Sequence, residues 1–373
     1  LLQPGCFQGI MDLSQFQVSP SNIRYKAISD NRILLSKSNT DQDKYDTLVY
    51  YIKSDEEIFI KIPNFIEKIE PNFTNIDNIE IGIEFENGSM LKSIQHGVFS
   101  DSKMTTFSLP SSVTHIFEGS FKNCFNLNQF IIEKESKLEV IEKDAFSNTK
   151  IEYLYIPKDV TELKCKWCRN IRYLKRVEVS KNNKRFSSID DDSIVVGNSI
   201  ENDQNFNILV FCGRNKKTIE IPQNIEIIGS YSLSDCRFDS IEFENNSKLR
   251  IIEKGAFSNS SIQKIQIPSQ ITQIGSRAFY GTSLKGPLVV PKTVSTIGVS
   301  AFENLNKLGE ITIYSDSALT SIGPLAFCLS SISGSLQIPS KVTSIGSSAF
   351  LGCTGLRSLL FYYNGNLNTI GDY

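Results

Sequence analysis

The side chains best suited to chemistry are eight cysteines, of which Cys165 and Cys168 form a Cys-x-x-Cys pair. This spacing occurs in redox-active dithiols and in zinc sites. Zinc needs four ligands, and the sequence has no second Cys-x-x-Cys or His pair to complete the set. Two roles stay open: a local disulfide or redox pair, and a structural role inside a repeat.

Other catalytic groups are scarce. The two histidines, His96 and His115, are expected in loops at the solvated surface, and no nucleophile-elbow, dinucleotide or P-loop motif occurs. The run Asp190-Asp191-Asp192 lies in a predicted turn, where Asp favours turn geometry, with weak calcium binding as its alternative role. We predict a non-enzymatic protein with no catalytic residue, no cofactor and no dedicated metal site.

Four Asn-x-Ser/Thr sequons are candidate glycosylation sites, at Asn72, Asn87, Asn245 and Asn259. Such sequons accept N-linked glycan in secreted proteins. They predict secretory exposure, although an Asn-rich chain also produces sequons by chance.

The elements that must position these groups are repeats. Seven times an aliphatic residue precedes proline, and further aliphatic residues follow three and six positions after each proline. The prolines are Pro63, Pro110, Pro157, Pro222, Pro268, Pro291 and Pro339. A second module, Ser-x-Leu-x-x-Ile-x4-Phe, alternates with this one, for example from Ser89 to Phe99. Each module spans roughly 22 to 26 residues, within the leucine-rich-repeat range of about 20 to 29.

One unit shows how the repeat should fold. Ile265 and Ile267 alternate inward on a short strand, and Pro268 ends that strand because it has no N–H to give. Ile271 to Phe279 then bring the chain back as a turn and a short helical or irregular segment. A unit of this size cannot bury its apolar face alone, so the units stack and their strands form one parallel sheet.

A larger duplication lies above this period. The segment from Tyr25 aligns without a gap with the segment from Phe186, and each reads as an inserted β-hairpin around an Asp/Asn/Ser turn. We therefore expect an N-terminal region over 1–62 with a hairpin at about 25–51, and a first repeat block over 63–185. A second hairpin is expected over 186–221, followed by a second block over 222–373 that stops within a repeat.

These motifs resemble the BspA-like, treponemal-type leucine-rich repeat family, with near-consensus copies at Ile262–Phe279 and Leu336–Cys353. The resemblance covers nearly all of the chain from about residue 25. It implies an α/β repeat solenoid, a rod or horseshoe with one parallel sheet, short strands, irregular or short helical returns and two inserted hairpins. It also implies surface-antigen-like adhesion to host proteins or cells, although a fold does not fix a function.

The repeat register also assigns three of the remaining six cysteines. Cys124, Cys236 and Cys353 share one slot, where we expect buried small hydrophobic side chains too far apart to pair. In the same register Trp167 and Cys168 occupy the Ala-Phe slots of a degenerate copy, which favours the structural role for this pair.

Composition limits the partners. A formal net charge of −2 and a pI near 5.9 give no basic footprint for nucleic acid. No apolar run of 18 residues predicts a membrane span, and no signal peptide is visible. The chain begins without Met and ends within a repeat, so we expect a fragment.

One surface patch stands out among the outward strand positions, most of which are small and polar. Ile131, Tyr153 and Tyr155 are expected on neighbouring strands beside Arg176, a composition typical of binding hot spots. The alternative is that tyrosine simply suits strand surfaces. We predict a cell-surface or secreted module that binds protein or glycan through this face or the hairpins; the alternative is a cytoplasmic scaffold or regulatory protein.

Overall fold

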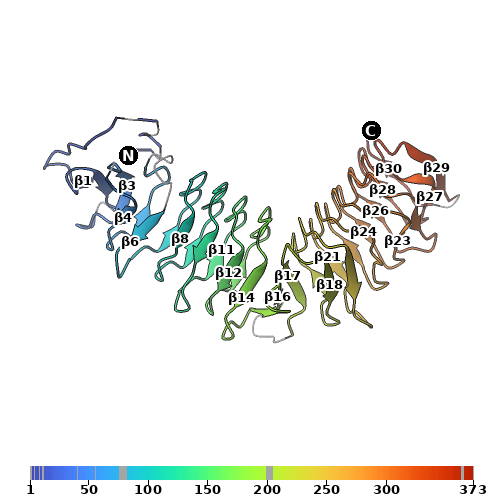
Figure 1. The fold of residues 1–373 in the computed structure, drawn as a ribbon. Coiled ribbons are helices and arrows are strands. Elements are labelled where there is room, and N and C mark those ends of the chain that lie inside the picture. The colour runs from blue at the N-terminus through green and yellow to red at the C-terminus, as the bar shows by residue number, and fades with distance from the viewer. Residues whose placement is uncertain are drawn as a thin grey trace. The chain divides into compact units, whose positions relative to one another are not determined.

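The structure is a computed structural model that describes residues 2–3, 5–7, 9–10, 12–39, 41–54, 56–74, 82–198, 205–362 and 365–372. The chain divides into two compact units, residues 1–184 and 185–373. Each is a stack of rungs built from turns and short strands (Figure 1). The described ranges contain no helix, and so none that could cross a membrane.

Unit 1 begins with an antiparallel hairpin region, after which each rung carries one longer strand and, in all rungs but the last, one strand of two residues. The hairpin strands are β1 (Tyr25–Ile28), β2 (Ile33–Ser36) and β3 (Thr47–Tyr51). The longer strands are β4 (Ile60–Ile62), β6 (Ile83–Phe85), β8 (Thr106–Ser108), β10 (Gln129–Ile131), β12 (Tyr153–Ile156) and β14 (Arg176–Val179). The two-residue strands are β5 (Lys68–Ile69), β7 (Ser93–Ile94), β9 (His115–Ile116), β11 (Val140–Ile141) and β13 (Glu162–Leu163).

Unit 2 repeats this order. Its hairpin strands are β15 (Phe186–Ile189), β16 (Ile194–Gly197) and β17 (Ile208–Cys212). The longer strands are β18 (Thr218–Ile221), β20 (Ser240–Phe243), β23 (Leu288–Val290), β25 (Ile311–Ile313), β27 (Ser333–Ile338) and β29 (Gly355–Phe361). The two-residue strands are β19 (Ile227–Ile228), β21 (Ile251–Ile252), β22 (Gln273–Ile274), β24 (Thr296–Ile297), β26 (Ser321–Ile322), β28 (Ser344–Ile345) and β30 (Thr369–Ile370).

Proline divides the longer strands into separate pairs. These pairs are β4–β6, β8–β10, β12–β14, β18–β20, β23–β25 and β27–β29, all parallel. In every pair the first strand precedes a proline and the second does not. The residue after the second strand donates back to the preceding rung, as Glu86 N does to Ile62 O at 3.0 Å and Ser180 N to Ile156 O at 2.9 Å. A proline at this slot has no hydrogen to donate, so the ladder stops at each proline-bearing rung.

The rung at Ile265 and Ile267 shows the same effect on both sides. Pro268 ends the longer segment of this rung and Pro291 ends that of the next. The backbone N–H that would join this rung to the one before it, and the N–H that would join it to the one after, are therefore both lacking. The segment is extended but belongs to no ladder, and the strand predicted there is absent.

The continuous sheets are instead made of the two-residue strands. In unit 2 a parallel ladder runs from β17 through β19, β21, β22, β24, β26 and β28 to β30, and in unit 1 one runs from β7 to β13. The prediction of one parallel sheet of longer strands is therefore wrong. Those strands are interrupted. The residue after a two-residue strand is never proline, so it keeps its N–H, as when Gly298 N donates to Ile274 O at 2.9 Å.

The predicted α/β class is also wrong, and of the two forms predicted for the returns, the irregular one is present and the short helical one is not. Each return contains two residues in the left-handed region four positions apart, such as Gly119 (φ 64°) with Asn123 (φ 62°) and Arg277 (φ 56°) with Gly281 (φ 63°). Two such residues per turn cannot belong to a right-handed helix. The backbone bonds to the next rung instead: Phe279 N donates to Ala301 O at 2.8 Å, and the equivalent bond recurs along the stack.

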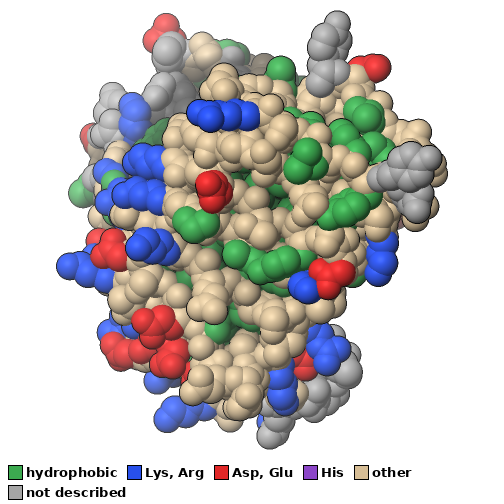
Figure 2. All heavy atoms as spheres, turned by 90° about the vertical axis from the view of Figure 1, so that its right-hand side faces the viewer, with side chains coloured by type: hydrophobic (Ala, Val, Ile, Leu, Met, Phe, Trp, Pro, Cys, Tyr) green, Lys and Arg blue, Asp and Glu red, His purple; other side chains and the backbone are tan. Residues whose placement is uncertain are grey.

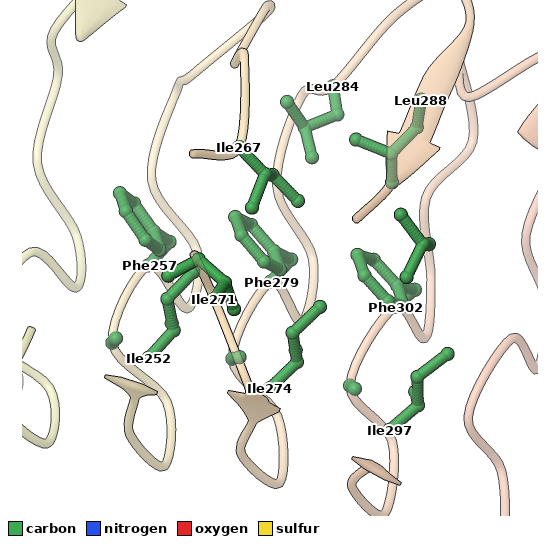
Figure 3. Packing of buried hydrophobic residues seen from close by; sticks show 14 of the residues in the cluster. Ile252, Phe257, Ile267, Ile271, Ile274, Phe279, Leu284, Leu288, Ile297 and Phe302 are labelled. Atoms are coloured by element: carbon green, nitrogen blue, oxygen red, sulfur yellow. The ribbon is translucent and has the colours of Figure 1, made fainter. Parts of the chain in front are cut away.

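The core is a column of stacked side chains. Phe257, Phe279, Phe302, Phe327 and Phe350 stack in sequence with ring centroids 4.9–5.5 Å apart and interplanar angles of 2–6°. Figure 3 shows three of these rings lying parallel, with Ile252, Ile274 and Ile297 in a second row. Each ring is covered by the rungs on either side, so burial depends on the neighbours.

The hairpins join directly to the stacks. β1–β2–β3 and β15–β16–β17 are antiparallel, each with a bulge at the same place, Leu34/Leu35 in one and Val195/Val196 in the other. β3 then pairs parallel with β5, and β17 with β19. The third strand of each hairpin region therefore pairs with the first two-residue strand, and in unit 2 it starts the continuous short-strand ladder.

The surface beside the last strands of unit 2 mixes all side-chain types. Figure 2 shows hydrophobic groups in small patches over the centre of this face, with basic and acidic groups mainly toward its margins. The exposed hydrophobic residues of the last rungs include Leu351, Leu360, Phe361 and Ile370.

Candidate binding face

The four residues predicted to form the patch lie on three successive longer strands of unit 1. Ile131 is on β10, Tyr153 and Tyr155 are on β12, and Arg176 is on β14 directly opposite Tyr153. Ile131 is 49% exposed and Tyr153 45% exposed, and Arg176 is also exposed. The structure therefore brings these three side chains to one face.

Tyr155 differs from the prediction, because it is only 9% exposed. Alternation along β12 points it outward, but it stands opposite Glu178 of β14 and lines the floor of a groove. Only part of its surface is available to a ligand there. Sequence alternation gives the side of the sheet but not how far neighbouring side chains cover it.

This groove has a volume of about 310 Å³. Its walls come from β10 and the residues around it on one side, and from β12 and β14 on the other. It lies where β10 and β12 share no ladder, because Pro157 ends the β12 rung. The lining residues are Asn128, Gln129, Phe130, Ile131, Ile132, Lys134, Tyr153, Tyr155 and Glu178.

Glu178 was not among the predicted site residues, yet it organises the groove. Its Oε2 accepts a hydrogen bond from the Tyr153 hydroxyl at 2.5 Å. A ring held in this way loses less conformational entropy when it binds a partner. The parallel register of β12 with β14 was the signal that could have identified it, because that register sets Glu178 opposite Tyr155, two residues after Arg176.

Unit 2 has a second groove, also at proline-interrupted rungs, with a volume of about 590 Å³. It is lined by residues of β20, of β23 and of the rung at Ile265 that pairs with neither neighbour. These include Glu242, Lys264, Ile265, Gln266 and Leu288. Both grooves follow from the same cause, the missing proline donor.

The Cys-x-x-Cys pair is placed by the repeat. Trp167 and Cys168 are buried and fill the Ala-Phe slots, whereas Cys165 is exposed, and no disulfide joins the two cysteines. The structural role is the one that this packing supports.

The histidines and the Asp run form no reactive cluster. His96 is exposed, and His115, which lies in β9 rather than in a loop, stacks on Phe117 with centroids 4.0 Å apart. Asp190 pairs with Lys216 at 2.5 Å, and this hydrogen bond lowers the pKa of the carboxyl group. Within the described ranges, no three His, Cys, Asp or Glu side chains are grouped to hold a metal ion.

The sequon asparagines all reach solvent. Asn72, Asn87, Asn245 and Asn259 are exposed, and each lies in a turn between strands. Asn87 and Asn245 follow the equivalent strands β6 and β20. Their exposure leaves each side chain accessible to modification.

A known family model identifies the repeats of this chain. The family model for the BspA type leucine rich repeat region matches residues 50–175, 180–286, 204–327 and 286–373, with six copies. The chain belongs to the BspA-type leucine-rich repeat family. No curated protein matches it.

Solved structures share the fold at low identity. The pneumococcal vaccine antigen PcpA is 22% identical with a TM-score of 0.62, over 94% of this chain and 87% of that one. A leucine-rich cell surface protein from Faecalibacterium prausnitzii is 18% identical with a TM-score of 0.58, over 92% and 98%. A leucine-rich repeat protein from Eubacterium ventriosum is 19% identical with a TM-score of 0.52, over 79% and 82%.

Proposed function

We propose that this BspA-type chain is a non-enzymatic interaction module of a cell-surface or secreted protein, and that it binds protein or glycan at the groove beside Tyr153. The carrying observation is the pair of half-exposed apolar side chains, Ile131 and Tyr153, at the mouth of a groove. Arg176 and Glu178 supply charge and hydrogen-bonding groups at its edge. Aromatic and Arg side chains around a desolvated centre are typical of binding hot spots.

Two relatives in fold support the location. One is described as a vaccine antigen and another as a cell surface protein. The alternative, an intracellular scaffold, is favoured by one observation: none of the eight cysteines forms a disulfide. Reduced cysteines are the rule in the cytosol.

The test is a double variant, Ile131→Ser with Tyr153→Ser. A panel of immobilised glycans and extracellular-matrix proteins is first screened with the wild-type chain, and the binders then serve as probes. The double variant should lose about 2 kcal/mol or more of binding free energy, roughly 30-fold in Kd. Its melting temperature should stay close to wild type, because both side chains are half in solvent.

Val289→Ser is the matched control, since Val289 is an outward strand residue of unit 2 with 45% exposure and lies outside both grooves. It should leave binding unchanged. Leu154 of β12 is buried in the core, so Leu154→Ser should unfold the rung. This variant shows what a loss of binding caused by misfolding looks like. Normal binding by the double variant, with loss after shortening residues 190–205, would instead assign recognition to the hairpin.

A further inference from the structure

Three cysteines occupy the same slot of different rungs, and one of them is bonded differently. The thiols of Cys124 and Cys353 each donate to the carbonyl of a phenylalanine one rung back, Phe99 O and Phe327 O, both at 3.0 Å. Cys236 lies 3.8 Å from the corresponding carbonyl, that of Cys212. In two copies the slot therefore holds an ordinary thiol donor, and in the third that bond is stretched.

A buried arginine donates a further hydrogen bond to the Cys236 sulfur. Arg214 is 3% exposed, and its Nη1 donates to Cys212 O at 3.2 Å and to Ser232 O at 3.0 Å. The same Nη1 donates to Cys236 Sγ at 3.1 Å. Because guanidinium has no acceptor, the Cys236 sulfur must act as acceptor in this contact. The Cys212 thiol itself donates to Gly213 O at 3.7 Å, and its side chain is close enough to shift the pKa of Cys236.

We propose that Cys212 and Cys236 form a buried redox-active dithiol in which the Arg214 guanidinium holds Cys236 as a thiolate. Small disulfide molecules oxidise this pair reversibly to an intrachain disulfide. A thiolate is the nucleophile in disulfide exchange, and an adjacent Arg is a recognised means of stabilising it. Neither Cys124 nor Cys353 has a cationic group bonded to its sulfur.

The pKa shifts of the two thiols follow from this geometry. Burial alone raises the pKa of Cys236, but the Cys212 hydrogen bond and the Arg214 charge outweigh it and lower the pKa to about 7, against a weaker opposing charge from Asp235. The hydrogen bond to Cys236, followed by burial, raises the pKa of Cys212. In Cys124, burial raises the pKa to about 11.

The exchange has two steps. The Cys236 thiolate attacks one sulfur of a small disulfide, forming a mixed disulfide and releasing one small thiolate. Cys212 then loses its proton to that thiolate and attacks the Cys236 sulfur, which forms the Cys212–Cys236 bond and releases the second small thiolate. Two electrons pass from the protein to the small disulfide. Because Arg214 stabilises the reduced form, the disulfide remains reducible.

The pair also occupies a structural junction. Cys212 ends β17, the strand that carries the hairpin into the short-strand ladder, and Cys236 lies in the return of the next rung. Both side chains are fully or almost fully buried. Oxidation would therefore fasten the hairpin to the first repeats of unit 2, and the reaction requires a local opening there.

The test uses the reduced full chain and glutathione disulfide at pH 7, followed by acid quenching, alkylation and peptide mass spectrometry. A peptide pair linked through Cys212 and Cys236 should form, while Cys124 and Cys353 stay alkylated as thiols. Arg214→Gln should slow the linkage about tenfold, because less thiolate is present at this pH. The proposal would be overturned if Cys212 and Cys236 were both still thiols at a time when the exposed Cys165 already carries glutathione. An unchanged rate of linkage in Arg214→Gln would also overturn it.

A measurement on the unmodified protein covers the case in which Arg214→Gln does not fold. The absorbance of thiolate near 240 nm should rise through about pH 7 in the wild-type chain, and Cys236→Ser should lack this step. Equal titration curves for the two proteins would show that Cys236 is an ordinary thiol, and the proposal would fail.

Discussion

At the scale of single residues, the amide hydrogen that proline lacks determines where the ladder of longer strands is interrupted. Each proline after a longer strand lacks the N–H that Glu86 and Ser180 give to the preceding rung. The ladder of longer strands stops there, and the groove at Pro157 and the one between Pro268 and Pro291 lie at such junctions. Two of the proline junctions therefore hold a side-chain groove.

Cys236 gives a prediction at the same scale. Its pKa is lowered from 9.0 to about 7, so its thiolate adds stability above the pKa of the unfolded chain, and this contribution is lost as pH falls through about 7. The free energy of unfolding of the wild-type chain, relative to that of Cys236→Ser, should rise by about 1–2 kcal/mol between pH 6.5 and pH 9 under reducing conditions. Denaturant unfolding at a series of pH values measures the difference.

Cys124→Ser is the matched control for this titration. Burial raises the pKa of Cys124 to about 11, so its thiol stays protonated over the whole range. The stability difference between wild type and this variant should not change between pH 6.5 and pH 9. A parallel pH profile for the two variants would contradict the ion pair at Cys236.

These residues also show where sequence reasoning ends. The slot shared by Cys124, Cys236 and Cys353 was predictable from the repeat register, and Cys124 and Cys236 are buried as expected, whereas Cys353 is partly buried. The different bonding of Cys236 was not predictable, since it depends on Arg214, which reaches it from the hairpin. Tyr155 is a similar case, because its cover comes from a neighbouring strand.

At the scale of elements, the returns explain why the helix prediction failed. The apolar spacing after each proline suits a short helix as well as an irregular turn. What decides between them is the pair of left-handed residues, and the chain places large residues such as Arg277 and Leu325 there as well as glycine. Bonds from one rung to the next, such as Phe302 N to Ala326 O at 2.8 Å, hold these conformations.

Six of the seven two-residue strands in unit 2 are followed by glycine, and these glycines have a different structural role. Gly298 does not need a left-handed φ, but a Cβ there would lie 2.5 Å from Ser276 N and 2.6 Å from Gly275 C. Real Cβ atoms do not approach backbone so closely, so adjacent rungs would have to separate. Gly298→Ala should therefore lower the free energy of unfolding by about 1–3 kcal/mol.

Gly309 provides the control, because a Cβ added there meets nothing within 4 Å and its φ is not positive either. Gly309→Ala should be neutral, or stabilising by up to about 1 kcal/mol through the unfolded chain. Denaturant unfolding of the two variants compares them directly. Equal stability would mean that the rungs adjust freely and that close approach does not explain this glycine.

At the scale of the whole molecule, the duplication read from the sequence is present in three dimensions. The two hairpin regions share their register and the position of their bulge, and each continues into a parallel short-strand ladder. This much was predictable because repeats and turns leave strong local patterns. Ligand identity is not encoded in that way, since it depends on side chains that the repeat leaves free to vary.

The compartment in which the chain works is tested by its glycosylation. The four sequon asparagines are exposed, and the equivalent Asn87 and Asn245 occupy turns after equivalent strands, so neither position requires local unfolding for modification. If the chain passes through a secretory pathway with N-glycosylation, at least one of the four should carry glycan. Protein purified from its native host should then lose mass on treatment with an N-glycosidase.

The Asn87→Gln and Asn245→Gln variants locate the glycan, because each should remove the mass shift of its own site without changing the fold, as expected for an exposed side chain. Asn304, half-exposed in a turn but outside any sequon, is the control position: Asn304→Gln should leave the glycan mass unchanged. An identical mass before and after treatment, at all four sites, would favour the reduced cytoplasmic scaffold. In that case the Cys212–Cys236 pair would stay in its dithiol form, and binding partners should be sought inside the cell.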